Sequence, residues 1–316
     1  MNMPDLQKLA LQTRSMREAS AALLIASGVL AIFLFISPPA ATQTPSLSVA
    51  VETPGAPDAF AAILIEAKAA VVYDLATGET LYAKNSGAQL PLASLTKILT
   101  VYAALAKLPP ETPITISPEA ASVEAPRAFS VGQTFSLADL ARLTLTGSLN
   151  DGAAAIAHAT ASRENKTESE MLAGAAAALD LGQTYALNGS GLDVNAFVSG
   201  GYGSAADLAH LAGALVERSA SIAAATTQSF AEAVSAGGTH FSIKNTDPIT
   251  DTILGLLLSK TGYTDLAGGN LALVFDVGMR HPVAVVVLGS SVKARFTDGA
   301  ALVAAALAHF AGVASL

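Results

Sequence analysis

The sequence contains no cysteine and few charged or aromatic side chains: 13% of its 316 residues are charged and 5% are aromatic. The absence of cysteine excludes a disulfide framework, a thiolate nucleophile and a thiolate metal site. Acidic residues outnumber basic ones, and the net charge of −8 argues against a nucleic-acid partner. The five histidines are scattered without a ligand spacing such as HExxH, so we expect neither a metal ion nor another cofactor.

Apolar residues, in contrast, make up 52% of the chain, enough for one large core or two lobes of one domain. An uncharged apolar run covers residues 21–36, slightly short of the roughly 20 residues that span a bilayer, and small residues on both sides extend it to residues 20–37. Basic residues precede the run, whereas no Lys or Arg follows it before Lys68. This asymmetry predicts a membrane-spanning segment with a cytoplasmic N-terminus.

These features divide the chain into four parts. We expect residues 1–19 to be a cytoplasmic leader, residues 20–37 a transmembrane signal anchor, residues 38–57 a linker rich in Pro, Ser and Thr, and residues 58–316 a folded domain outside the cytoplasm. A signal peptide cleaved near residues 38–42, with secretion of the mature protein, is the alternative.

Inside the folded domain, residues 91–107 show an apolar period typical of a helix. Ser94 and Lys97 lie three positions apart on this predicted helix, so the lysine amine can reach the serine hydroxyl. Lysine activates a serine only as the neutral amine, which burial and a second nearby cation would favour. A Ser-x-x-Lys pattern alone is weak evidence, and a second copy occurs at residues 290–293.

The rest of the domain predicts an α+β fold. A β-hairpin pattern occupies residues 63–83, helical patterns fill the middle, and three strand patterns follow before a last helix. The N-terminal hairpin most economically joins the C-terminal strands in one antiparallel sheet, with an inserted helical lobe and a cleft between them. Residues 228–246 fit neither pattern. The expected helices are residues 136–146 and 153–161, joined by a Gly-Ser-Leu-Asn-Asp-Gly loop, then 171–181, 205–216 and 298–310; the expected strands are 254–264, 270–277 and 282–289.

Three short motifs stand in order along the domain: Ser94-x-x-Lys97, Ser148-x-Asn150 and Lys260-Thr261-Gly262. This ordered set resembles that of the serine penicillin-recognising enzymes. From about residue 60 to residue 310 the chain is similar to low-molecular-mass penicillin-binding proteins of the D-alanyl-D-alanine carboxypeptidase family. The resemblance implies a β-lactamase/DD-peptidase-like fold, an antiparallel sheet flanked by helices, with residues 58–316 as the catalytic domain. Many relatives have glycine at position 149, where this chain has leucine, and we expect little effect.

The resemblance also implies roles that fit the chemistry of the residues. Ser94 would attack the carbonyl between two D-alanines and form an acyl-enzyme. Lys97, neutral beside Lys260, would take the proton of Ser94, and Ser148 would relay it to the departing amine.

The other motif residues would bind the peptide. Asn150 can hold both Lys97 and a substrate amide, and the strand carrying Lys260 would pair with the peptide as an added strand. Lys260, Thr261 and Arg295 would bind the terminal carboxylate, as the resemblance implies. The backbone N–H groups of Ser94 and Tyr263 would form the oxyanion hole. The substrate-binding set is thus Asn150, Lys260, Thr261, Gly262, Tyr263 and Arg295.

We therefore predict a serine-type D-alanyl-D-alanine carboxypeptidase that trims peptidoglycan stem peptides, is inhibited covalently by β-lactams, and is tethered to the cell membrane by its N-terminal helix. A D,D-endopeptidase shares every motif. A class A β-lactamase needs a Glu-x-x-Leu-Asn segment, but Thr184 precedes Leu187-Asn188 here. A non-catalytic, membrane-tethered wall-binding protein is the alternative from another class.

Overall fold

The computed structural model describes residue 13 and residues 58–312 of the chain. The chain divides into two units, Met1–Thr53 and Pro54–Leu316, and residues 58–312 belong to the second. The predicted leader, signal anchor and linker lie outside the described residues, apart from residue 13. Within the described part of the chain, no helix has the length and apolar character needed to cross a bilayer.

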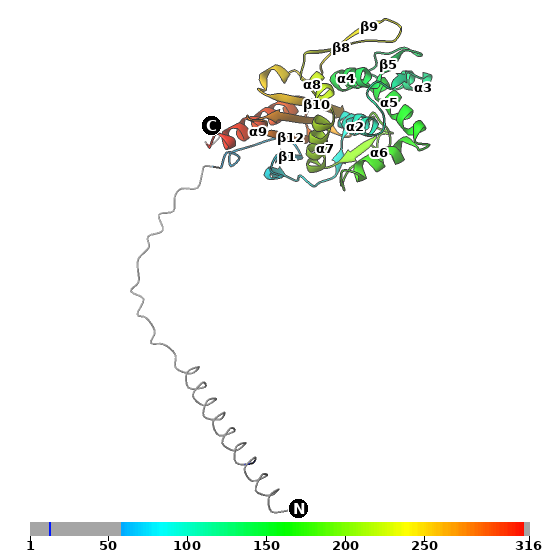
Figure 1. The fold of residues 1–316 in the computed structure, drawn as a ribbon. Helices are drawn as coiled ribbons and strands as arrows, with labels where there is room; N and C mark the ends of the chain where they lie inside the picture. Colours follow the sequence, from blue (N-terminus) through cyan, green and yellow to red (C-terminus); the bar gives the residue numbers. More distant parts are fainter. Residues whose placement is uncertain (1–12, 14–57, 313–316) are drawn as a thin grey trace, which may run out of the picture. The chain divides into compact units, whose positions relative to one another are not determined.

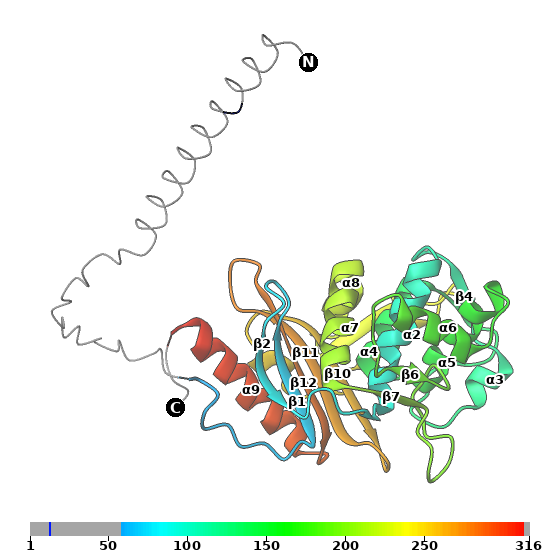
Figure 2. The same ribbon diagram turned by 90° about the horizontal axis from the view of Figure 1, so that it is seen from below.

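An antiparallel five-stranded sheet confirms the predicted pairing of the N-terminal hairpin with the C-terminal strands, and Val71 lies opposite Val286. The order is β10 (Leu256–Thr264), β11 (Gly268–Asp276), β12 (Pro282–Ser290), β1 (Ala69–Asp74) and β2 (Thr80–Lys84) (Figure 1 and Figure 2). Among the described residues the strand at one end of this sheet, β10, pairs with a neighbouring strand on one side only, so its other edge is free for main-chain pairing.

Alternate residues of the central strands face two separate cores. Val71 and Val286 belong to the core shared with the helical lobe, whereas their neighbours Val72 and Val285 belong to a second core. α7 (Ala205–Arg218) packs on the first face and α9 (Ala294–Phe310) on the second (Figure 2). Because β12 is buried on both faces, its interior is a continuous apolar run rather than an alternating one.

The chain that enters the sheet shows why two predicted boundaries were wrong. β1 begins at Ala69, later than its apolar pattern predicts, because the N–H groups of Glu66 and Ala67 donate to the Asp298 carboxylate at 3.1 and 3.0 Å instead of pairing with a strand. Ser290 Oγ donates to the same carboxylate at 2.7 Å. Asp298 therefore lies inside α9 as a buried acceptor and does not begin that helix.

The helical lobe is built around α2 (Thr96–Lys107), whose first nine residues are all buried. α4 (Leu137–Gly147), α5 (Asn150–Arg163) and α6 (Glu168–Ala177) pack against it. The loop predicted between α4 and α5 shrinks to two residues, 148 and 149. It can be this short because Ser148 adopts a left-handed conformation, φ 57° and ψ 35°, that ends α4 and reverses the chain at once.

The remaining elements are short. The unassigned residues 228–246 form a hairpin that extends past α4 at the edge of the helical lobe (Figure 1). Its strands are β8 and β9, and the full set is β3 (Leu90–Pro91), β4 (Pro113–Thr115), α3 (Pro118–Ser122), β5 (Thr134–Ser136), β6 (Tyr185–Ala186), β7 (Gly201–Gly203), α8 (Ala220–Ala225), β8 (Phe230–Val234) and β9 (His240–Lys244), with 3-10 turns at Ala93–Leu95 and Thr250–Thr252.

Candidate active site

Ser94 lies in the 3-10 turn Ala93–Leu95, directly before α2 begins at Thr96. The predicted helix thus starts later than its sequence pattern suggests. Ala93 has a left-handed backbone, φ 48°, which places Ser94 at the mouth of a cleft. The turn fits because Gly191, φ 76°, passes so close that a Cβ there would lie 1.9 Å from Ala93 O.

Lys97 is fully buried and its amine contacts three oxygens. Nζ lies 2.7 Å from Ser94 Oγ, 2.7 Å from Asn150 Oδ1 and 2.8 Å from Ser190 O. Burial, and next the positive charge of Lys260, hold the pKa of Lys97 well below its usual value. A neutral amine has two N–H groups and one lone pair. Since the amide and the carbonyl oxygens can only accept, the lone pair is left for the hydroxyl of Ser94.

Lys260 and Ser148 form a second buried pair beside the first. Lys260 Nζ donates to Ser148 Oγ at 2.9 Å and to Thr261 O at 2.7 Å. Burial, followed by the charge of Arg295, lowers the pKa of Lys260 to about 7, against an opposing effect of Asp247. Lys97 and Lys260, which are ordinarily charged side chains, thus both have a strongly lowered pKa in this site.

Asn150 is more constrained than the sequence suggests. Its Oδ1 accepts from Lys97, as expected, but its Nδ2 donates to Glu124 O and Ala125 O, both at 3.0 Å. Both amide hydrogens are thereby used. In this structure the side chain joins α5 to residues 124–125 and orients Lys97. Binding of a substrate amide by Asn150 stays a prediction, and it would require the exchange of one of these bonds.

The end of β10 passes directly beside Ser94. A Cβ on Gly262 would lie 3.0 Å from Leu92 O and 3.3 Å from Ser94 N, so a side chain at this position would push the strand away. Arg295 Nη1 donates to Gly262 O at 2.6 Å, and its Nε is buried without a hydrogen-bond partner among the described residues. Thr261 Oγ1 lies 2.6 Å from Thr246 Oγ1.

Tyr263 follows on the same strand, and its side chain is half exposed, with the hydroxyl 3.2 Å from Asp265. A cleft of about 550 Å³ opens between this strand and the helical lobe. Its lining includes Ser94 and Asn150 together with three carboxylates, and carries no basic side chain. The carboxylates are Glu124, Asp193 and Asp265.

The structure thus brings every predicted motif residue to one place, and it adds a group that the sequence did not indicate. The Asn188-Gly-Ser-Gly191 segment, interpreted as a plain turn, supplies the Ser190 carbonyl that contacts Lys97. Its composition indicates a turn but not the partner of a backbone carbonyl. Thr184, at the position where a class A β-lactamase has its glutamate, donates to Asp207 on α7. Within residues 58–312, no cluster of His, Asp or Glu is arranged to hold a metal ion.

Comparison with known proteins agrees with this geometry. The family model described as D-alanyl-D-alanine carboxypeptidase matches residues 53–292. The chain belongs to this family. It is a serine D-alanyl-D-alanine peptidase, with the sequence resemblance and the DD-peptidase fold both confirmed.

Individual relatives give the same result. A D-alanyl-D-alanine endopeptidase of Pseudomonas aeruginosa is 29% identical over 266 residues, covering 81% of this chain and 84% of that protein. Penicillin-binding protein D2 from Listeria monocytogenes, solved with cefotaxime bound, has a TM-score of 0.65 and 25% identity over 77% of this chain and 98% of its own. The Streptomyces K15 DD-transpeptidase has a TM-score of 0.67 and 23% identity over 78% and 98%.

Proposed function

We propose that this carboxypeptidase removes the terminal D-alanine of peptidoglycan stem peptides through an acyl-enzyme on Ser94. The observation that carries the proposal is the set of oxygens around Lys97 Nζ: two acceptors, Asn150 Oδ1 and Ser190 O, lie at 2.7 and 2.8 Å, and Ser94 Oγ lies at 2.7 Å. In the neutral amine the two acceptors would take the N–H groups and the lone pair would face the serine hydroxyl. An amine of lowered pKa in this arrangement is a general base rather than a solvated surface cation.

The proposed reaction has two steps. Ser94 Oγ attacks the carbonyl carbon of the penultimate D-alanine while its proton moves to Lys97 Nζ. The bond to the terminal D-alanine nitrogen then breaks, and that nitrogen receives a proton through Ser148, which Lys260 holds at 2.9 Å. In the second step water attacks the ester, and both the shortened peptide and Ser94 are released. The backbone N–H groups of Ser94 and Tyr263 serve as oxyanion donors in both steps.

The direction of the bound peptide follows from the charges around Ser94. We assign the terminal carboxylate to the side of Lys260, Thr261 and Arg295, because the Arg295 guanidinium, held on β10 by its bond to Gly262 O, provides a positive charge there. The cleft itself is lined by carboxylates and by no basic side chain, and these carboxylates would repel the terminal carboxylate. The upstream part of the peptide then runs along the open edge of β10, where main-chain pairing is available.

The test is intact-protein mass spectrometry after incubation with benzylpenicillin. A covalent adduct on the wild-type protein and none on Ser94→Ala is the expected result. If the wild type consumed the drug without an adduct, the protein would be a β-lactamase, and if it neither reacted nor consumed the drug, a non-catalytic binding protein.

A D,D-endopeptidase activity is a second candidate, because the Pseudomonas aeruginosa relative carries that name. The two activities are separated by their products. A carboxypeptidase releases free D-alanine from a monomeric pentapeptide, whereas an endopeptidase splits a cross-linked dimer into monomers. Incubation of the purified protein with each substrate in turn identifies the preferred reaction.

We also propose, from the sequence alone, that residues 20–37 anchor the protein in the cell membrane with the peptidase outside the cytoplasm. The uncharged run and the basic residues before it support this proposal. The protein should sediment with membranes and be digested by protease added to spheroplasts. Recovery of a soluble mature form beginning near residue 42 would show that the segment is cleaved instead.

A further inference from the structure

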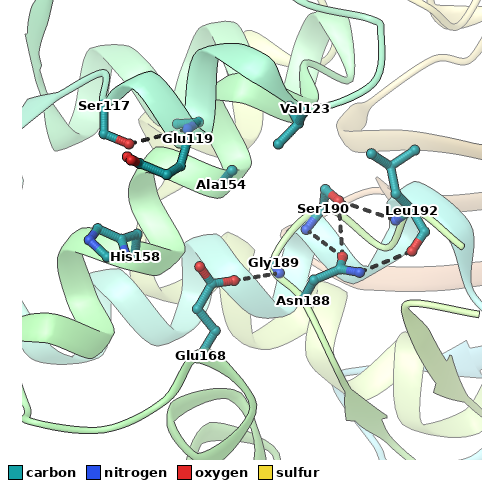
Figure 3. A pocket seen from close by; sticks show the side chains of 11 residues that line it. Ser117, Glu119, Val123, Ala154, His158, Glu168, Asn188, Gly189, Ser190 and Leu192 are labelled. Atoms are coloured by element: carbon teal, nitrogen blue, oxygen red, sulfur yellow. Dashed lines mark hydrogen bonds between the residues drawn. The ribbon is translucent and has the colours of Figure 1, made fainter. Parts of the chain in front are cut away.

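A pocket of about 280 Å³ lies behind the catalytic lysine, and none of the proposed steps uses it. Its walls come from α3, α5, α6 and the 188–192 segment (Figure 3). Leu192 lines both this pocket and the catalytic cleft. The segment therefore separates the two spaces, and a side chain that contacts it from behind can influence Lys97.

Within this segment the N–H groups after Asn188 are held in two different ways. Asn188 Oδ1 accepts from Ser190 N at 3.2 Å and from Gly191 N at 2.8 Å, so the side chain closes the turn on itself. Gly189 N instead points out of the turn and donates to Glu168 Oε2 at 3.2 Å (Figure 3).

The hydrogen bond from Gly189 N to Glu168 lies one residue before the carbonyl that contacts Lys97. Gly189 O accepts from Thr100 Oγ1 at 2.7 Å, and the next carbonyl, Ser190 O, accepts from Lys97 Nζ at 2.8 Å. Gly189 is pressed against α5, where a Cβ would lie 2.4 Å from Ala157 Cβ. A shift at Gly189 N is therefore transmitted along one peptide unit to the carbonyl that orients the base.

We propose that Glu168 is a positioning residue for the proposed reaction: by accepting from Gly189 N, it holds the Ser190 carbonyl against the amine of Lys97. Glu168 does not contact the cleft that contains Ser94 and touches no reacting atom. Its place at the start of α6, whose preceding residue Thr167 closes a capping box with Glu170, keeps the carboxylate on a rigid element.

The titratable groups that face Glu168 are His158 on α5 and Glu119 on α3, and burial raises the pKa of Glu168 itself. Those that act on Lys97 are Lys260 and Asp151. An acceptor that contacts an amine favours its protonated form. Loss of the Ser190 contact should therefore slow acylation at high pH and also move the acidic limb of the pH profile to lower pH.

The experiment compares three replacements of Glu168 in the full chain, with benzylpenicillin acylation of Ser94 followed by mass spectrometry. Glu168→Gln keeps an oxygen at the same reach without the charge, and should acylate within about twofold of wild type. Glu168→Asp keeps the charge but is one carbon–carbon bond, about 1.5 Å, shorter. It should behave like Glu168→Ala, with the limiting acylation rate lowered about tenfold, as for one lost buried hydrogen bond, and with unchanged drug affinity before acylation. Glu119→Gln, a carboxylate change in the same pocket, is the control.

The inference rests on the proposed function, and the same assay separates their failures. A wild type that forms no adduct on Ser94 would overturn both. A reactive wild type together with a fast Glu168→Asp would overturn the inference alone, because acylation would then not depend on the reach of the side chain to Gly189 N. If Glu168→Ala does not fold, the Gln and Asp variants decide the question between them. A rate loss without a shift of the acidic limb would indicate a merely structural role and would also overturn the inference.

Discussion

The most informative prediction concerns the stability cost of Lys260. This side chain is 2% exposed, and its pKa is about 7 in the folded protein against an ordinary value of 10.5. Between these two values the unfolded chain binds a proton that the folded protein does not. Stability should therefore rise with pH across this window, since the unfolded state loses its excess proton as pH approaches 10.5.

The size of the effect follows from the two pKa values. At pH 7.5 the loss of the proton on folding costs about 4 kcal/mol, and at pH 9.5 it costs only about 1 kcal/mol. Lys260→Met removes this cost and gives up hydrogen bonds to Ser148 and Thr261, each worth about 1 kcal/mol. We expect the variant to be about 2 kcal/mol more stable than wild type at pH 7.5, and inactive.

Urea denaturation of both proteins at pH 7.5 and pH 9.5 provides the measurement. The advantage of Lys260→Met should shrink by about 2 to 3 kcal/mol between the two pH values, because only the wild type gains from deprotonation of this lysine in its unfolded state. A stability difference that stays constant with pH would refute the reasoning, since Lys260 would then keep its proton in the folded protein.

Two further predictions concern the neighbours of the nucleophile. Asn150→Asp places a carboxylate against Lys97. The negative charge favours the ammonium form of Lys97 and should move the acidic limb of the acylation pH profile to higher pH. An unchanged pH profile of adduct formation would contradict the assignment of Lys97 as the base. Gly262→Ala should slow acylation at least about tenfold, because its Cβ would meet Leu92 O at 3.0 Å and displace β10 from the serine, a loss of about 1.4 kcal/mol in transition-state stabilisation. Gly174→Ala, at a helical position with no atom within 4 Å, is the matched control, and equal rates for both glycine variants would rule out this role of the strand.

The sequence by itself determined the features that depend on neighbours in the chain. The i, i+3 spacing brings Lys97 to 2.7 Å from Ser94 in the structure, because one turn of helix geometry is enough. The order of the three motifs identified the family, and the apolar runs predicted the sheet of hairpin-connected strands. The pairing of β1 with β12 followed because exposed edges and apolar faces leave few alternatives.

The tertiary structure decided the contacts between segments that lie far apart in the sequence. The Ser190 carbonyl is separated from Lys97 by 93 positions, and Asp298 reaches the chain before β1 across 231 positions. Neither contact produces a pattern in the sequence. Every residue has a backbone carbonyl, and an aspartate near the start of a helix is equally typical of a helix cap. Nor could the sequence show that Asn150 has no free amide hydrogen, because its partners are two backbone oxygens. Motifs state which side chains are present, but only packing determines which of their hydrogen bonds are already made.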